Sequence, residues 1–190
     1  MLSLRRMNEA EIRLLYANAL TRDFPPSELK SLSAILNMYH KGLYDVLGAY
    51  YHEQLVGYAL LYCPSDERLV LLDYLAIEPQ FRKQGIGSEM LALLRTHYAS
   101  RSDALMIECE RPKAAPDERE ARNRIRFYTQ AGAVLTNVRI WLFGVEYSIL
   151  VLPCMHKPIP QWDWSDKMLD LYRQMLPPDL FEHNVRLIRA

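Results

Sequence analysis

The sequence is poor in cysteine and histidine, two residue types that often hold disulfides or metals. Its three cysteines, Cys63, Cys109 and Cys154, are odd in number and widely spaced, which argues against a disulfide framework and against a Cys-x-x-Cys site. The five histidines show no spacing typical of metal ligands. We therefore expect neither a structural disulfide nor a bound metal.

The sequence also has no excess of charge and no long hydrophobic run. Lysine plus arginine and aspartate plus glutamate number 23 each, so no global field attracts the chain to nucleic acid or to an acidic membrane surface. No apolar run reaches the length of a membrane span, and the first residues lack the apolar core of a signal peptide. We expect a cytoplasmic protein that binds neither nucleic acid nor membranes.

The remaining composition is that of a globular protein, with 50% hydrophobic and 24% charged residues. A length of 190 residues is sufficient for one sizeable core. The composition changes after Pro153, where further prolines, Trp162 and Trp164 precede a helical pattern. We expect a main domain over 1–152 and a C-terminal helical extension over 153–190, packed on the same domain.

Helix signals stand near the start of the chain. Asn8 and Glu11 form a capping-box pattern that predicts the start of a first helix. Ser27, which follows two prolines, is the expected cap of a second helix. Two helices are therefore expected after a short first strand.

Strand signals follow. The β-rich runs 44–51 and 55–63 predict a hairpin, and 70–77 predicts a further strand. A helical pattern separates 70–77 from the apolar run 104–109, so these two strands should be parallel and joined by a right-handed crossover. The predicted fold class is α+β, a three-layer arrangement in which a mixed, mostly antiparallel sheet of about seven strands carries helices on both faces.

The most informative segment, Arg82-Lys83-Gln84-Gly85-Ile86-Gly87, lies between a predicted strand and a predicted helix. Helix starts present unpaired N–H groups and a positive dipole end, and glycine lets an anion approach them. A P-loop is excluded because Ser88 and Glu89 follow Gly87, and a dinucleotide fingerprint is excluded because Met90 replaces its third glycine. A pyrophosphate site and an ordinary strand-loop-helix connection remain.

The pattern Arg-x-x-Gly-x-Gly, after a strand ending Leu-Ala-Ile-Glu-Pro, resembles the pyrophosphate-binding loop of the GNAT superfamily, the acyl-CoA-dependent N-acyltransferases. The segment from Tyr128 to Ala133 is similar to the superfamily's Tyr-x-x-x-Gly-Phe/Ala segment. Together with the element order, the resemblance covers 1–152. It implies the acyl-CoA N-acyltransferase fold, in which the fourth and fifth strands splay apart.

The resemblance implies acetyl-CoA as cosubstrate and no metal. It assigns the thioester to the backbone of Leu75, Ala76 and Ile77. Many relatives have an asparagine six residues before the tyrosine, where this chain has Arg122 followed by Asn123; both are cofactor-binding candidates, and a solvated helix face is the alternative. The pyrophosphate is assigned to Arg82, Lys83, Gln84, Gly85, Ile86, Gly87 and Ser88.

Acyl transfer to an amine requires a base, because an ordinary amine is protonated at neutral pH. Glu108 is the first candidate, because the segment 105–108 is similar to a fifth-strand segment that carries a catalytic glutamate in some family members. Strand alternation places Glu110 on the same face. The alternative for Glu108 is an ion pair with an arginine such as Arg122 or Arg126, and Asp73 is the second candidate base.

Tyr128 matches the family tyrosine that approaches the CoA sulfur and acts as general acid. Its alternative is a core role, because it lies on the apolar stripe of its predicted helix.

We therefore expect an N-acetyltransferase in which a primary amine, on a small molecule or a peptide, attacks acetyl-CoA directly. The acceptor matches no diagnostic pattern, and a homodimer is a possible assembly. The alternative is a catalytically silent GNAT-like module that senses acyl-CoA or binds a protein partner.

Overall fold

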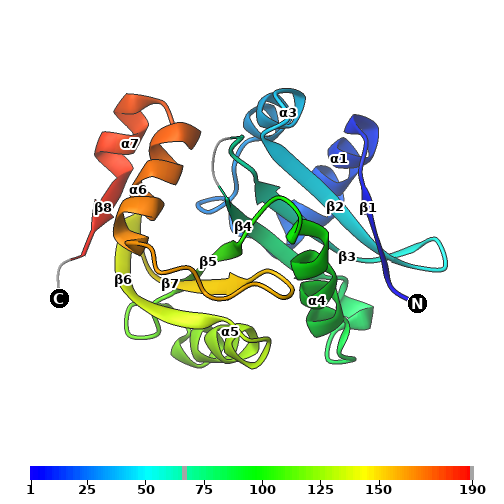
Figure 1. Cartoon of the computed structure of the whole chain (residues 1–190). Helices are drawn as coiled ribbons and strands as arrows, with labels where there is room; N and C mark the ends of the chain where they lie inside the picture. Colours follow the sequence, from blue (N-terminus) through cyan, green and yellow to red (C-terminus); the bar gives the residue numbers. More distant parts are fainter. Residues whose placement is uncertain (66–67, 189–190) are drawn as a thin grey trace. The chain divides into compact units, whose positions relative to one another are not determined.

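The computed structural model describes residues 1–65 and 68–188. The chain divides into an N-terminal unit, Met1–His97, and a C-terminal unit, Tyr98–Ala190. Each unit is described by itself below (Figure 1). The predicted division at residue 152 lies inside the C-terminal unit and stays a prediction.

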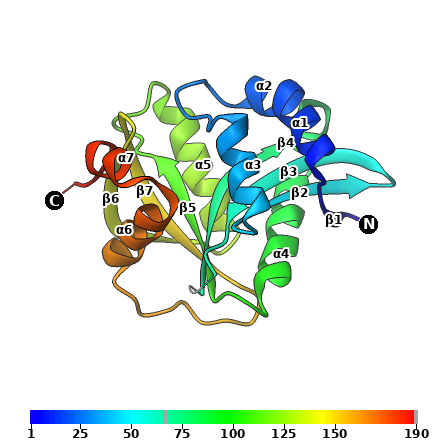
Figure 2. The ribbon, with the colours of Figure 1, turned by 90° about the horizontal axis from the view of Figure 1, so that it is seen from above.

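The N-terminal unit is built on four antiparallel strands with helices on both faces. The strands pair in the order β1 (Ser3–Arg6), β2 (Tyr44–Tyr51), β3 (Gln54–Tyr62) and β4 (Leu69–Ile77). One face carries α1 (Glu9–Leu15), a π-helical turn (Tyr16–Leu20), α2 (Thr21–Asp23) and α3 (Leu32–His40), and the other carries α4 (Ile86–Tyr98) (Figure 1 and Figure 2). A 3-10 turn, Pro79–Phe81, separates β4 from the glycine loop.

The predicted start of the first helix is confirmed. The Asn8 side chain accepts a hydrogen bond from the Glu11 backbone N–H at 3.0 Å, and the Glu11 carboxylate accepts one from the Asn8 backbone N–H at 2.8 Å. This capping box satisfies two N–H groups that a helix start leaves without partners.

The predicted cap of the second helix is wrong. The cap of α3 is Ser31, whose hydroxyl accepts a hydrogen bond from the Ala34 N–H at 3.2 Å, and not Ser27. The reason is a long-range contact. The Tyr74 hydroxyl of β4 donates to the Glu28 carbonyl at 2.8 Å and accepts from the Lys30 N–H at 2.9 Å, so these backbone groups are not used in a helix.

The pairing of β3 with β4 contains an irregularity close to the glycine loop. Leu61 pairs with Leu72 and Leu60 with Tyr74, so Asp73 is the extra residue of a β-bulge. A bulge changes the twist of the strand and the direction of the side chains that follow it. Before the bulge the side chains of β4 are buried, and from Leu75 onwards they are partly exposed.

The C-terminal unit repeats this plan with four antiparallel strands. Here β5 (Ala104–Glu110) pairs with β7 (Val145–Pro153), β7 with β6 (Val134–Leu142), and β6 with β8 (Val185–Leu187). Helix α5 (Glu118–Gln130) covers one face, and α6 (Trp164–Met175) and α7 (Pro178–Asn184) lie on the other (Figure 1). The described chain thus has eight strands, against the expected number of about seven.

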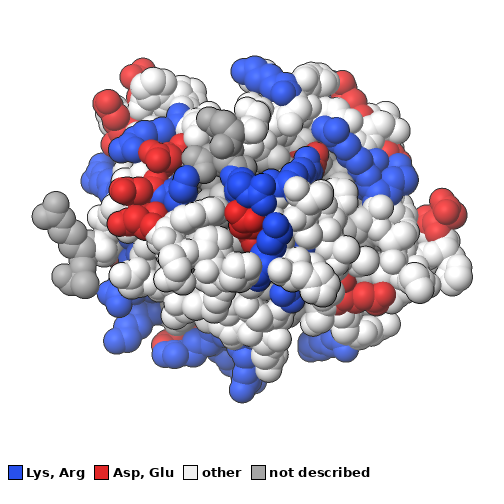
Figure 3. Space-filling model, in the orientation of Figure 1, with Lys and Arg blue, Asp and Glu red and all other residues white. Residues whose placement is uncertain are grey.

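The additional strand comes from the C-terminal extension. The predicted helices of 153–190 are present as α6 and α7, but the chain then forms β8, which adds to the edge of β6. Residues 189–190 of the extension lie outside the described part. Within the described ranges, no helix has the length and apolarity needed to cross a membrane. Positive and negative side chains are interspersed on the face drawn in Figure 3.

Gly57 provides a test of the close approach of β3 to β4. A Cβ at this position would lie 2.7 Å from Ile77 Cδ1 and 2.9 Å from the Ala76 carbonyl oxygen. Because the second atom belongs to the backbone, Gly57→Ala should move the end of β4 and lower the free energy of unfolding by about 1–3 kcal/mol. Chemical denaturation measures this change. An unchanged free energy of unfolding would contradict the prediction, and Ala59→Ser, on the same strand, controls for a general effect of mutating β3.

Candidate functional site

The glycine loop connects the end of β4 to α4 and becomes buried only where the helix begins. Arg82, Lys83, Gln84 and Gly85 are exposed, whereas Ile86 is buried in the first turn of α4. Gly85 has a φ of +83° and open space around the position of a Cβ. Only glycine adopts this conformation without a steric cost, so Gly85 sets the sharp entry of the chain into α4.

The start of α4 has the properties of an anion site. Its first intrahelical hydrogen bonds run from the Ser88 and Glu89 N–H groups to the Gly85 carbonyl, both at 3.1 Å. Among the described residues, the N–H groups of Ile86 and Gly87 have no hydrogen-bond acceptor. Helix α4 has 13 residues, so these two N–H groups lie at the positive end of a full helix dipole.

The strand end before the loop holds the backbone predicted to face a thioester. In the register, Ala76 pairs with Tyr58 and Ile77 with Gly57, and all three residues from Leu75 to Ile77 are partly exposed. The Ile77 carbonyl accepts a hydrogen bond from Arg82 Nε at 2.9 Å. Arg82, the first residue of the glycine loop, is therefore hydrogen-bonded to the strand end.

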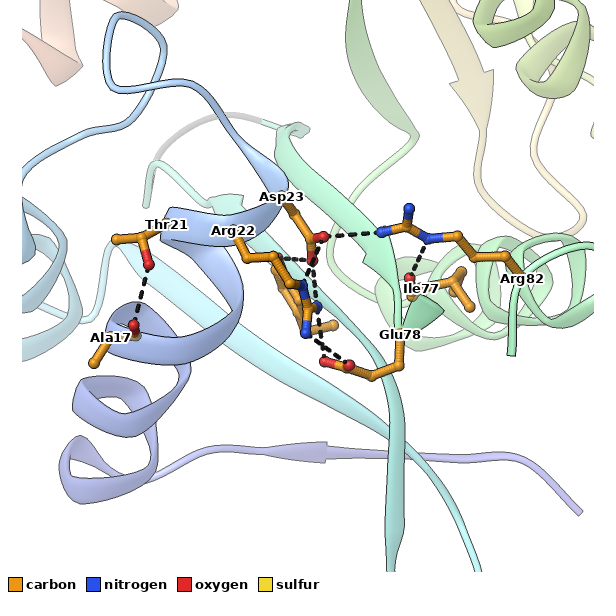
Figure 4. Close-up of polar contacts among 8 residues, drawn as sticks. Ala17, Thr21, Arg22, Asp23, Ile77, Glu78 and Arg82 are labelled. Carbon is orange, nitrogen blue, oxygen red and sulfur yellow. Dashed lines mark hydrogen bonds and ion pairs between the residues drawn. The ribbon is translucent and has the colours of Figure 1, made fainter. Parts of the chain in front are cut away.

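A charged cluster surrounds this connection, and we call it the Asp23 cluster (Figure 4). The Asp23 carboxylate accepts hydrogen bonds from Arg82 at 2.8 Å, from Arg22 at 2.7 Å and from the Tyr58 hydroxyl at 2.9 Å. Arg22 also donates to Glu78 at 3.1 and 3.2 Å. The cluster consists of Arg22, Asp23, Tyr58, Glu78 and Arg82.

The cluster shifts the pKa values of its members. Burial of the Asp23 carboxyl raises its pKa, but the hydrogen bonds from Arg22 and Tyr58 and the charge of Arg82 outweigh burial, so the net pKa lies below the ordinary value. Burial and the adjacent Asp23 carboxylate raise the pKa of Tyr58 well above its ordinary value. Asp23 is therefore a carboxylate and Tyr58 a neutral donor at neutral pH.

Asp73, the second candidate base, is held by other groups of the N-terminal unit. Lys30 Nζ lies 2.8 Å from the Asp73 carboxylate, and the Tyr44 hydroxyl also donates to it. The Asp73 side chain is only 6% exposed. Both carboxylate oxygens thus have a donor, one of them an ammonium group.

Glu108, the first candidate base, lies on β5 in the C-terminal unit. It is partly exposed, and its Oε1 accepts a hydrogen bond from the Tyr172 hydroxyl of α6 at 2.7 Å. The alternation of β5 is as expected: Glu110 is also partly exposed, and Cys109 between them is buried. Glu110 lies 3.9 Å from Arg124.

Tyr128 lies on the buried face of α5. Its side chain packs edge-on against Phe127 at a ring centroid distance of 5.0 Å. Burial, followed by the nearby Cys109, raises the pKa of the Tyr128 hydroxyl above its ordinary value. It is therefore a protonated phenol at neutral pH.

Arg122 and Asn123 are both exposed on α5. Arg122 forms an ion pair with Glu118 one turn earlier, and its side chain is 62% exposed. This arrangement is common on solvated helix faces. Across residues 1–65 and 68–188, no group of three or more histidine, cysteine, aspartate or glutamate side chains is placed to hold a metal ion.

The sequence-derived candidates therefore form separate sets. In the N-terminal unit, Arg82 joins the loop to the β4 backbone, while Asp73 belongs to a different ion pair. In the C-terminal unit, Glu108 and Tyr128 lie on β5 and α5, and Arg122 faces solvent.

Comparison with known proteins finds a family model that matches part of this chain. Residues 43–132, which include the glycine loop and end at Gly132, match the family model described as the acetyltransferase (GNAT) domain. This segment of the chain is similar to a GNAT domain. Over 82 residues, or 42% of the chain, it is 32% identical to the histone acetyltransferase type B catalytic subunit of Cryptococcus neoformans. The match covers 20% of that relative, so the chain spans only a small part of its length.

Solved structures show the same fold over most of the chain. A GNAT-family protein from Bacteroides thetaiotaomicron aligns with a TM-score of 0.70 at 19% identity, over 90% of this chain and 96% of the other. Spermidine N-acetyltransferase from Vibrio cholerae, in complex with CoA and spermine, aligns with a TM-score of 0.63 at 12% identity, over 80% and 95%. The predicted family and the predicted fold class, α+β with the acyl-CoA N-acyltransferase fold, are confirmed.

Sequence reasoning on the GNAT domain missed the Asp23 cluster and Tyr172. Asp23 and Arg82 are 59 residues apart, and Tyr172 and Glu108 are 64 apart. Only Asp23 had a feature visible in the sequence, because it is an acidic residue directly after Arg22 at the end of a helical pattern. That local pattern does not indicate that Asp23 pairs with Arg82 on the glycine loop.

Gly85 provides a test of the loop geometry of the GNAT domain. Gly85→Ala forces a side chain into the left-handed region, at a cost of about 1–2 kcal/mol, and the loop should relax away from the start of α4. We expect a lower free energy of unfolding and weaker binding of CoA, measured by denaturation and by titration calorimetry. Gly42→Ala is the matched control, because Gly42 has a φ of +72° and equally open space. Equal CoA affinities in the two variants would contradict a special role for Gly85.

Proposed function

We propose that the chain is an acetyl-CoA-dependent N-acetyltransferase that transfers an acetyl group directly to a primary amine. The observation that carries the proposal is the exposed glycine loop at the start of α4, with two backbone N–H groups that lack acceptors among the described residues. A diphosphate is an anion of the size and charge that such a helix start binds. The GNAT match over 43–132 supports CoA as the molecule that carries this diphosphate.

The donor contacts follow from the elements that flank the loop. The N–H groups of Ile86 and Gly87 bind phosphate oxygens, and exposed Lys83 adds charge beside them. The backbone from Leu75 to Ile77 is partly exposed, as a strand must be to offer hydrogen bonds to the pantetheine arm and the thioester. An N–H of this strand stabilises the oxyanion that forms when the amine attacks.

Glu108 is the base of this proposal. It must take a proton from an ammonium group, directly or through water, to expose the lone pair that attacks. Glu108 is partly exposed, so an amine can reach it, and the Tyr172 hydroxyl donates to its Oε1. Asp73, in contrast, is paired with the Lys30 ammonium, so an incoming amine would compete with a resident cation. Asp73 is assigned a structural role.

Tyr128 is the general acid. The thiolate of CoA leaves when the tetrahedral intermediate collapses, and it must be protonated. Because burial raises the pKa of Tyr128, the phenol keeps its proton throughout the neutral range and can supply it.

Transfer is direct in this proposal because Cys109, the thiol next to Glu108 in sequence, is a poor nucleophile. Burial raises the pKa of the adjacent Cys109 thiol to about 12, so almost none is present as the reactive thiolate at neutral pH. The acceptor is an amine on a small molecule or on a peptide. The solved relative in complex with CoA and spermine supports a primary amine as the acceptor class.

Binding of the donor tests the function. Acetyl-CoA and CoA should each raise the midpoint of thermal unfolding, because both bind the folded state through the diphosphate. Dephosphorylated pantetheine, which lacks the diphosphate, is the control and should have a much smaller effect. A panel of polyamines, amino acids, aminoglycosides and peptides, with detection of released CoA thiol, then identifies the acceptor. Unchanged unfolding midpoints with acetyl-CoA at saturating concentration would refute the proposal.

Two substitutions separate chemistry from binding. Glu108→Gln and Tyr128→Phe should each lower kcat by roughly 100-fold and leave the Kd for acetyl-CoA unchanged, because general acid-base groups act in the transition state. In wild type, kcat should not fall between pH 8 and pH 10 through loss of the Tyr128 proton, since its pKa is raised. Glu146→Gln and Tyr39→Phe are the matched controls.

Equal loss of donor binding and rate in the two variants would contradict these assignments. A chain that binds acetyl-CoA but transfers no acetyl group to any amine of the panel would favour the silent sensor instead.

A further inference from the structure

Asp23 is the centre of the charged cluster beside the glycine loop, and its side chain is only 6% exposed. A buried carboxylate is costly unless donors surround it. Asp23 has three donor side chains from three different segments: Arg22 from α2, Tyr58 from β3 and Arg82 from the loop. Figure 4 shows the Arg22 and Arg82 side chains approaching Asp23 from separate parts of the chain.

Arg82 turns this carboxylate into a support for the loop. One edge of its guanidinium donates to Asp23 at 2.8 Å, and its Nε donates to the Ile77 carbonyl at 2.9 Å. Because a guanidinium is planar and rigid, two such bonds fix its orientation. Gln84 also donates a hydrogen bond, but to the Gln80 carbonyl four residues earlier. That bond joins two residues of the segment between β4 and α4 and does not hold the loop to another element.

Glu78 completes the arrangement on the other side. It is 13% exposed and accepts two hydrogen bonds from Arg22, while its backbone N–H donates to the Val56 carbonyl at 2.9 Å. Asp23 and Glu78 thus share Arg22 as a donor. Glu78, directly after β4, is bonded to Arg22 of α2, and Arg82 of the loop is bonded to Asp23 of α2. A continuous set of bonds links α2, the end of β4 and the first residue of the loop.

We propose that Asp23 is a positioning residue for the donor: through Arg82 it holds the glycine loop and the Ile77 backbone in the geometry that binds acetyl-CoA. The proposal rests on the proposed function, since it assumes that this loop binds the diphosphate. Preorganised N–H groups bind an anion more tightly than mobile ones, because less ordering is needed on binding. Arg82, whose charge is paired with Asp23, serves as a clamp, and the phosphates are bound by the backbone.

The decisive variant is Asp23→Asn, which keeps the size of the side chain and removes its charge. We expect a Kd for acetyl-CoA about 10-fold higher than in wild type, measured by titration calorimetry. Glu9→Gln is the matched control, because Glu9 also contacts two basic side chains, Arg13 and His40, but lies on α1 without a bond to the loop. Its Kd should equal that of wild type.

A double-mutant cycle distinguishes positioning from general stability. Arg82→Lys retains the charge but cannot form both bonds, so alone it should raise the Kd about as much as Asp23→Asn. The double variant should bind no more weakly than the weaker single variant, because both changes break the same clamp. A merely structural role predicts lower unfolding midpoints with an unchanged Kd.

Three results overturn the proposal. The first is an unchanged Kd for acetyl-CoA in Asp23→Asn, and the second is tighter binding in that variant, which would mean that Asp23 keeps Arg82 away from the phosphates. The third is additive effects of the two substitutions in the double-mutant cycle. If Asp23→Asn does not fold, Tyr58→Phe removes one donor from Asp23 and should raise the Kd 2- to 3-fold, and an unchanged Kd there is equally contrary. Absence of acetyl-CoA binding in wild type refutes the proposed function, and with it this proposal. A bound donor with no effect of Asp23→Asn refutes only the positioning role.

Discussion

The bulge at Asp73 is the constraint on which the N-terminal unit depends. An ordinary strand would bury alternate residues to its end, but the extra residue divides β4 into a buried first part and a partly exposed end at Leu75–Ile77. The same irregularity lets Asp73 meet Lys30, while the next residue, Tyr74, holds the backbone of Glu28 and Lys30. One local break in register thus exposes the strand end and fixes the segment before α3.

The end of β4 is held by groups from both of its neighbours along the chain. Gly57 on β3 leaves room for Ile77, and Arg82 holds the Ile77 carbonyl from the loop side. Neither the close packing at Gly57 nor the hydrogen bond from Arg82 depends on a ligand. In the proposed function the strand end offers its backbone to the donor, so side chains, and not a further strand, must fix its position. The Asp23 cluster meets this requirement.

The sequence predicted the features whose cause is local. The capping box of Asn8 and Glu11 depends on residues three positions apart. Ser27 and Ser31 both satisfy the local rule for a helix cap, so the rule alone could not identify Ser31 as the cap of α3. The hydrogen bond from Tyr74 to the Glu28 carbonyl, 46 residues away, decides between them. The partners of Asp23 and Glu108 were equally beyond prediction, because no periodicity relates residues joined only by the tertiary fold.

The two carboxylates considered as bases differ in the kind of donor they meet. Lys30 brings a full positive charge to Asp73, whereas Tyr172 brings a neutral hydroxyl to Glu108. An amine that approached Asp73 would have to compete with the Lys30 ammonium, whereas Glu108 is partly exposed on β5. Tyr172 belongs to α6, in the extension beyond residue 152, so the extension supplies a partner for Glu108 as well as a strand for β6. In the proposed function, donor recognition is thus concentrated in one short loop and its clamp, while the groups proposed to activate the amine come from distant parts of the sequence.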